Sequence, residues 1–293
     1  LTEDADGYNE FAVDRSYVIV QAAIDDHWNT RVTLDADRLK ETELPDGSGV
    51  TVDTKYRVFV KHAWLSYKAP KPGLELRAGM IDTPYAPFYD AFVGFRYVTE
   101  SFPRQWKLLD TADLGVSVLG TQGDGLVDWN VQLVNGEGYA KPEIDAGKMV
   151  QARVTVDPLA GGDLHLPITG FVGYSGQPTA DQPILTWIGA IGFKQEYITA
   201  WAEVDGQSAD ASGLGFSGTL APKIPEIVGL FARFDQWDPD TSADGDSGSL
   251  LIVGPTHDFW AKGSVALTYE QTMTEAAPDA PGRALVAHVQ AGF

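Results

Sequence analysis

The last stretch of the chain, Leu285–Phe293 with the sequence LVAHVQAGF, shows the pattern that decides the fold. Side chains alternate along it with a period of two. One face carries Leu285, Ala287, Val289, Ala291 and Phe293, and the other carries Val286, His288 and Gln290. Because successive side chains of a β-strand point to opposite faces, this pattern predicts a strand with one apolar face.

The same alternation recurs along the whole chain, whereas helical spacing of apolar residues is scarce. It marks about fifteen segments, near residues 11–24, 27–39, 56–69, 73–80, 111–121, 126–136, 147–158, 164–176, 183–194, 196–206, 210–221, 225–237, 248–257, 262–272 and 283–293. Short turns alternate with longer connections between the segments, and both kinds contain turn-forming Gly, Pro, Asp or Ser. Alternating segments of about ten residues are typical of strands that span a membrane.

The composition excludes several classes of protein. The 293 residues include 21 Lys and Arg against 41 Asp and Glu, a net charge of −20, so a basic nucleic-acid-binding face is not expected. There is no cysteine, which excludes disulfides and thiolate catalysis. No run approaches 18 consecutive apolar residues, so the chain has no helical membrane span.

Two β-architectures compete for this pattern. A water-soluble β-sandwich or barrel would turn its apolar faces inward, and a membrane barrel would turn them toward lipid. Small alanines among the apolar faces, the alternation of short and long connections, and aromatic residues near segment ends favour the membrane barrel. These aromatic residues are Trp28, Tyr56, Tyr67, Trp106, Trp187, Trp237, Phe259, Trp260 and Phe293.

We therefore expect an all-β fold, a transmembrane antiparallel up-and-down β-barrel. No internal repeat or linker divides the chain, so residues 1–293 are predicted to form one domain. The longest connection, at about residues 81–110, is expected to be a constriction loop, because connections of that length are usually functional. The alternative is a loop that lies over the outside of the barrel.

Several stretches resemble bacterial outer-membrane porins, in particular the phosphate-selective porin O/P superfamily and related general porins. Residues 11–18 (FAVDRSYV) are similar to an early strand of that superfamily, and residues 74–84 (LELRAGMIDTP) resemble the strand that enters its constriction loop. Phe293 matches the C-terminal aromatic residue of such barrels. The resemblance implies 16 strands, with 14 as the next choice, a homotrimer, and the outer membrane of a Gram-negative bacterium. The acidic excess departs from the basic pore of the phosphate-selective members.

In a barrel of this size the residues opposite the lipid face line a water-filled lumen. The candidate pore-lining and constriction residues are Arg15, Tyr17, Arg31, Asp35, Arg77, Asp82, Asp90, Arg96, Glu100, Arg104, Arg153 and Arg233. Acidic residues of the loop facing arginines of the wall would create a transverse field that orients polar solutes.

The predicted function is that of a porin for passive diffusion of small hydrophilic solutes or ions. Such a channel has no catalytic residues and needs no cofactor. Its expected partners are the solutes, membrane lipid and lipopolysaccharide, with no nucleic acid. Two alternatives remain: a barrel that serves as a structural sleeve or holds a partner, and an outer-membrane hydrolase, for which His288 is a weak candidate.

A possible metal site lies in the sequence DPDTSADGD, which places Asp238, Asp240, Asp244 and Asp246 close together. Calcium prefers several oxygen ligands from closely spaced carboxylates, so weak calcium binding is one hypothesis. A solvated acidic loop is the favoured interpretation.

Overall fold

The computed structural model describes residues 11–13, 15–37, 55–70, 73–143, 146–176, 183–225, 227–260, 263–278 and 280–292. Fifteen strands and two short helices form in these residues. The strands are β1 (Val18–Ala23), β2 (Trp28–Asp37), β3 (Arg57–Lys68), β4 (Leu74–Asp82), β5 (Ala112–Gln122), β6 (Val127–Val134), β7 (Lys148–Val156), β8 (Ile168–Gly176), β9 (Ile184–Gln195), β10 (Ile198–Ser208), β11 (Ser212–Ile224), β12 (Val228–Asp238), β13 (Gly248–Trp260), β14 (Gly263–Thr274) and β15 (Gly282–Ala291). The helices are α1 (Ala86–Val93) and α2 (Phe102–Gln105).

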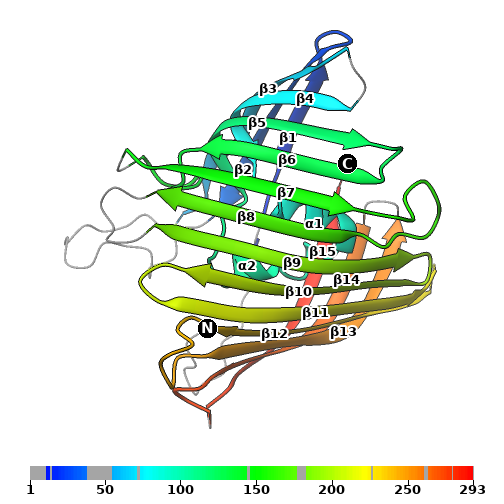
Figure 1. The fold of residues 1–293 in the computed structure, drawn as a ribbon. Helices are drawn as coiled ribbons and strands as arrows, with labels where there is room; N and C mark the ends of the chain where they lie inside the picture. Colours follow the sequence, from blue (N-terminus) through cyan, green and yellow to red (C-terminus); the bar gives the residue numbers. More distant parts are fainter. Residues whose placement is uncertain are drawn as a thin grey trace.

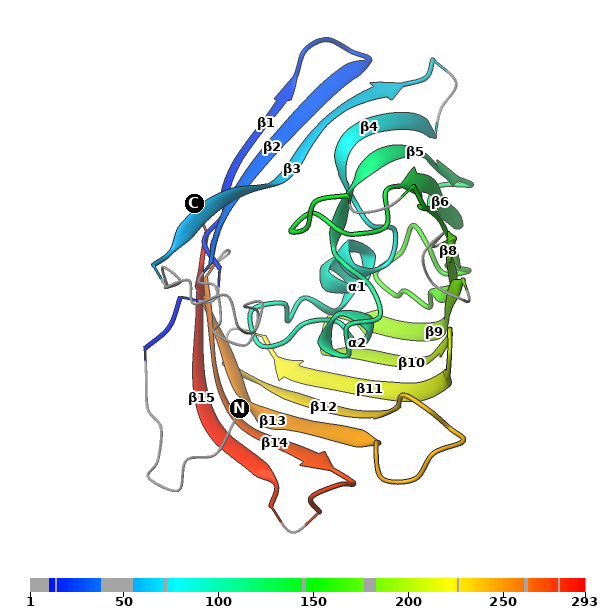
Figure 2. The ribbon, with the colours of Figure 1, turned by 90° about the vertical axis from the view of Figure 1, so that its left-hand side faces the viewer.

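The strands form one continuous sheet in which every strand pairs with its neighbours in sequence (Figure 1). All of these pairs are antiparallel. The sheet curls into a barrel, and Figure 2 shows its two end strands, β1 and β15, on the same side of the molecule. Because neighbours alternate in direction and the described residues contain fifteen strands, β1 and β15 run the same way.

The wall of the barrel is apolar outside and polar inside. Along β8, Ile168, Val172 and Tyr174 are exposed, whereas Thr169 and Ser175 are buried. Strands β9, β11 and β12 repeat this alternation, whereas all six residues of β1 are exposed. This is the reverse of a water-soluble core and is the arrangement of a barrel that faces lipid.

The connection between β4 and β5, residues 83–111, lies inside the barrel together with its two helices (Figure 2). Pro87 fits the first turn of α1, where the missing backbone N–H costs no hydrogen bond. Gly94 ends the helix in the left-handed region with φ of 83°, and its N–H donates to the carbonyl of Asp90. The loop is therefore a structured element that narrows the lumen.

Aromatic side chains of the loop rest against glycines of the barrel wall. A Cβ added to Gly215 would lie 2.6 Å from the ring of Phe102, and one added to Gly248 would lie 2.9 Å from the ring of Trp106. These rings belong to or pack on one buried apolar cluster that joins the loop to the wall. Burying a large aromatic side chain contributes about 1.5–3 kcal/mol, so several such contacts fix the loop in place.

The predicted all-β up-and-down barrel is confirmed. Each predicted segment overlaps one observed strand, and the count of fifteen in the described residues lies between the two predicted numbers, 14 and 16. The first segment is the main difference, because residues 11–17, as far as they are described, precede β1 and form no strand. The C-terminal aromatic residue, Phe293, lies outside the described residues. No helix in the described ranges is long and apolar enough to cross a bilayer.

Candidate functional site: the constriction of the barrel

A charged region of the lumen is built around the carboxylate of Glu100 on the inward loop. Three arginines surround it. Arg15 Nη2 lies 2.9 Å and Arg96 Nη2 lies 2.6 Å from Glu100 Oε1, and Arg104 Nε lies 3.6 Å from Oε2. Arg15 also donates to the backbone carbonyl of Arg96 at 2.9 Å, which ties the segment before β1 to the loop.

Two further carboxylates extend this network at both ends. Asp90 accepts a contact of 3.1 Å from Arg96 Nε, and Asp110 accepts one of 2.8 Å from Arg104 Nη1. The side chains of Arg96 and Arg104 are 20% and 30% exposed, so water reaches the network. The result is a row of alternating charges along the edge of the loop.

The barrel wall facing this row contributes Asp35 from β2 and Lys61 from β3. Their charged groups are 3.8 Å apart, and Lys61 also donates to the hydroxyl of Tyr17 at 2.7 Å. Lys61 Nζ lies 4.8 Å from the ring centre of Tyr17 and 5.5 Å from that of Tyr139. Lys61 is within electrostatic range of Arg15, Arg96 and Glu100, so wall and loop form one site.

We call this site the constriction cluster. It consists of Arg15, Tyr17, Asp35, Lys61, Asp90, Arg96, Glu100, Arg104, Asp110 and Tyr139. Four of these residues are cations and four are carboxylates, so their formal charges cancel at neutral pH. A balanced cluster provides strong local fields without a large net potential.

The carboxyl groups of the loop differ in their tendency to hold a proton. Burial raises the pKa of Asp90 to about 6, against the opposing effect of Arg96 and Arg15. Burial also acts to raise the pKa of Glu100, but Arg96, Arg104 and Arg15 together outweigh it and lower that pKa. Of these two carboxylates, Glu100 therefore keeps its negative charge to lower pH, and Asp90 gains a proton first as the pH falls.

A second cluster lies on the wall formed by β2, β3 and β4. Asp82 is its centre. Its carboxylate lies 2.9 Å from His62 Nε2, 3.4 Å from Arg77 Nη1 and 3.9 Å from Arg31 Nη1. Arg77 also pairs with Glu75 at 2.9 Å. This cluster is distinct from the constriction cluster, although both contain predicted residues.

Two basic residues of the wall hold the backbone of the loop. Arg153 Nε donates to the carbonyl of Pro84 at 2.8 Å, and its guanidinium carbon lies 4.2 Å from the ring centre of Phe88. Lys194 Nζ donates to the carbonyl of Phe92 at 2.6 Å. These contacts fix both ends of α1 against the inside of the barrel.

Other charged groups lie beneath the loop and do not reach the lumen. Arg233 and Asp235 are both fully buried and are paired at 2.6 Å. Arg233 also donates to the backbone carbonyl of Glu100, and the hydroxyl of Tyr85 donates to Glu203. Arg233 was expected in the pore lining, but the loop covers it, so it acts here as an anchor.

The structure thus sorts the predicted residues into groups. It brings seven together in the constriction cluster: Arg15, Tyr17, Asp35, Asp90, Arg96, Glu100 and Arg104. Arg31, Arg77 and Asp82 meet in the second cluster, and Arg153 and Arg233 hold the loop. Whether these positions control permeation stays a prediction.

Sequence reasoning missed Lys61, Asp110 and Tyr139. Lys61 escapes strict alternation, because the pairing of β2 with β3 shifts between Thr33 and Leu34, and Lys61 and His62 are both buried in consecutive positions. A β-bulge of this kind turns an extra side chain inward. The signal in the sequence that could have identified Lys61 is a charged residue in the middle of an alternating segment.

The four aspartates proposed for calcium do not converge. Asp238 accepts the N–H of Asp240 at 3.1 Å, and Asp240 accepts the N–H and the hydroxyl of Ser242 at 3.0 and 2.6 Å. In the described ranges, no three His, Asp or Glu side chains are placed to hold a metal ion. The geometry of this loop gives the calcium hypothesis no support.

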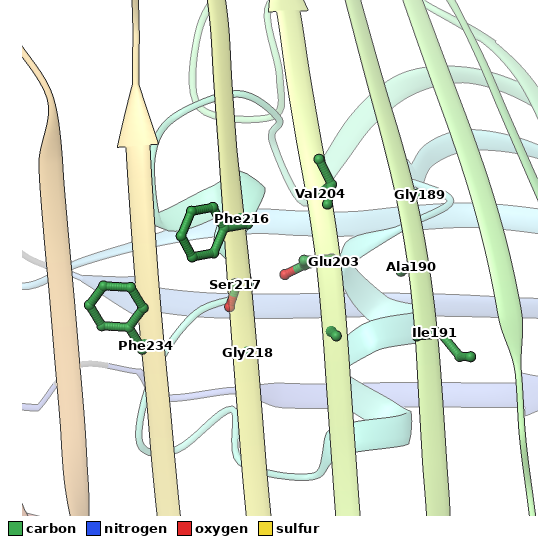
Figure 3. A pocket seen from close by; sticks show the side chains of 10 residues that line it. Gly189, Ala190, Ile191, Glu203, Val204, Phe216, Ser217, Gly218 and Phe234 are labelled. Atoms are coloured by element: carbon green, nitrogen blue, oxygen red, sulfur yellow. The ribbon is translucent and has the colours of Figure 1, made fainter.

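A shallow depression of about 600 Å³ lies on the outer surface over β9–β12. Figure 3 shows Val204, Phe216 and Phe234 projecting around it, with no side chain at Gly189 and Gly218. A Cβ added to either glycine would meet open space. The depression belongs to the apolar outer wall and not to the lumen.

No family model matches the chain, and no curated protein matches its sequence. Solved structures do match the fold. The structure of Salmonella typhi OmpF in complex with daunomycin has a TM-score of 0.65 and 11% identity, over 97% of this chain and 92% of that chain. The anion-selective porin from Comamonas acidovorans has a TM-score of 0.58 and 9% identity, over 96% and 89%. A trimer form of OmpT, an outer-membrane protein of Vibrio cholerae, has a TM-score of 0.56 and 16% identity, over 94% and 88%.

The fold is therefore that of the outer-membrane porins. Their size agrees with this chain, because the matches cover nearly all of both partners. The likeness does not single out the phosphate-selective porin O/P superfamily that the sequence motifs resemble.

Proposed function

We propose that the chain is a porin that lets small hydrophilic solutes or ions diffuse passively through a water-filled lumen. The observation that supports this proposal is the barrel wall, apolar outside and polar inside, combined with the inward loop at residues 83–111. The wall turns apolar side chains outward and polar ones inward, and the loop places a charged, partly exposed cluster across the lumen. A polar passage within an apolar cylinder is what a diffusion channel requires.

The balanced constriction cluster supports passage of more than one class of solute. Neutral polar solutes and ions of either sign meet both cations and carboxylates there. The passage involves no bond making or breaking, and the proposal requires no cofactor. We place the channel in the outer membrane of a Gram-negative bacterium, because proteins of the same fold include an outer-membrane protein of Vibrio cholerae. Membrane lipid and lipopolysaccharide would then surround the apolar outer wall.

We further propose a homotrimer. The support is the trimer form described for the Vibrio cholerae protein of the same fold. Each barrel would then conduct independently, so closures of a single assembly would occur in three equal steps.

The decisive experiment reconstitutes the purified protein into planar lipid bilayers in KCl and into liposomes for swelling in sugar solutions. We expect stepwise ohmic conductance and swelling that slows with increasing sugar size. A folded protein that inserts but neither conducts nor admits sugars would contradict the channel and would favour the structural-sleeve alternative. Single or paired closing steps would contradict the trimer alone.

A further inference from the structure

A cavity of about 310 Å³ lies inside the barrel on the side of α1 that faces the short turns. The loop side of the cavity is formed by Phe88 and Phe92 of α1. The wall side includes Asp128 near the start of β6 and Lys194 near the end of β9. The volume is at the small end of the range of about 300–1,000 Å³ that is typical of ligand sites.

The two carboxylates of the cavity are already engaged. Asp128 pairs with Arg153, and Asp157 lies 2.6 Å from His165 Nδ1. Asp157 also accepts the backbone N–H groups of Leu159 and Leu166, at 3.0 and 2.9 Å. Both carboxylates are thus held by partners other than the lysine of the cavity.

Among the described residues, Lys194 forms no ion pair with a carboxylate. Its ammonium group donates to the carbonyl of Phe92 and lies 5.4 Å from the ring centre of that residue. Within the described part of the chain no carboxylate lies within 4.0 Å of it, and another cation, Lys223, repels it. An ammonium group in such a position attracts an anion.

We propose that this cavity binds a small monocarboxylate carried on one planar apolar ring. The carboxylate would contact the ammonium group of Lys194, and the ring would lie against Phe88 and Phe92, which supply an apolar surface. The nearby Asp128 and Asp157 disfavour a second negative charge on the ligand. The inference rests on the proposed function, because it makes the cavity a binding site for a solute that diffuses through the channel.

The test measures binding of sodium benzoate to the folded full chain in detergent micelles by titration calorimetry. We expect benzoate to bind, and Lys194→Gln to weaken binding about tenfold, the usual effect of losing one charge-assisted hydrogen bond. Lys194→Arg should retain binding, which separates charge from misfolding. Lys68→Gln is the matched control, since Lys68 is an exposed lysine at the turn end of β3.

Three further probes define the ligand class. Benzyl alcohol lacks the charge, phthalate carries two charges, and acetate lacks the ring, so each should bind more weakly than benzoate. Benzoate affinity that is the same in Lys194→Gln, or equally reduced in Lys68→Gln, would overturn the proposal. Acetate binding as tight as benzoate binding would overturn the role of the two phenylalanines.

The outcomes also separate this inference from the porin proposal. Benzoate binding by a protein that does not conduct would refute the channel and leave the cavity intact. A conducting protein that shows no benzoate binding would refute the cavity alone. Where both hold, benzoate should interrupt the KCl current, and Lys194→Gln should raise the half-blocking concentration about tenfold.

Discussion

The charge balance of the constriction cluster leads to a quantitative prediction for Glu100→Gln. This substitution removes the carboxylate on which Arg15, Arg96 and Arg104 converge and keeps the shape of the side chain. The formal charge of the cluster then changes from zero to one positive. Solutes that pass the cluster will meet a potential that favours anions and opposes cations.

The size of the effect follows from Coulomb's law. At about 7 Å in water, one unit charge changes the energy of a monovalent ion by about 0.6 kcal/mol. Anions gain this amount and cations lose it, so the ratio of anion to cation permeability should rise about sevenfold. Screening matters: the Debye length is about 30 Å at 0.01 M salt and about 3 Å at 1 M. The full effect is therefore expected only in dilute salt.

The assay is the zero-current potential across a bilayer with a KCl gradient, recorded in dilute and in concentrated salt. Glu100→Asp keeps the charge and should leave the ratio near that of the unchanged protein. Glu196→Gln removes a carboxylate at the exposed turn between β9 and β10 and serves as the matched control. An unchanged ratio for Glu100→Gln in dilute salt would refute our view that this cluster controls permeation.

Two further predictions follow from the loop. Because burial raises the pKa of Asp90 to about 6, its carboxylate gains a proton as the pH falls through that value, and the cluster becomes more positive. Anion preference should therefore rise between pH 7 and pH 5, and Asp90→Asn should show the low-pH selectivity at pH 7; a flat pH profile of the unchanged protein would contradict this. Gly248→Val should drive Trp106 from its place on the wall and destabilise the barrel by about 1–3 kcal/mol, seen as a lower unfolding temperature by circular dichroism. Gly218→Val is its control, because a Cβ there meets open space; equal effects of the two valines would show that steric conflict with the loop is not the cause.

The strands were predictable because a period of two is a local property of the sequence. Each strand of a barrel wall has lipid on one side and the lumen on the other, so its pattern does not depend on distant partners. The pattern fails where local geometry changes. Lys61 at the bulge of β3 is one case, and the segment that contains Arg15 and Tyr17 is another, since its side chains join the constriction cluster instead of extending β1.

The candidate site was predictable in its parts and not in its arrangement. Alternation shows that Arg233 points inward, but only the path of the loop shows that it is covered. The same holds for Glu203, which meets Tyr85 across 118 positions of sequence. Such contacts depend on the packing of residues 83–111 against the wall, and no short-range pattern encodes that packing.

The aromatic rings that rest on glycines have a consequence for how this sequence can diverge. At Trp106 with Gly248, the ring has room only because the glycine has no side chain. A larger residue at the glycine is tolerable only after the ring becomes smaller, so the two positions should change together during descent. Homologous chains should therefore show correlated substitutions between the inner loop and β13, even where the charged residues of the passage differ.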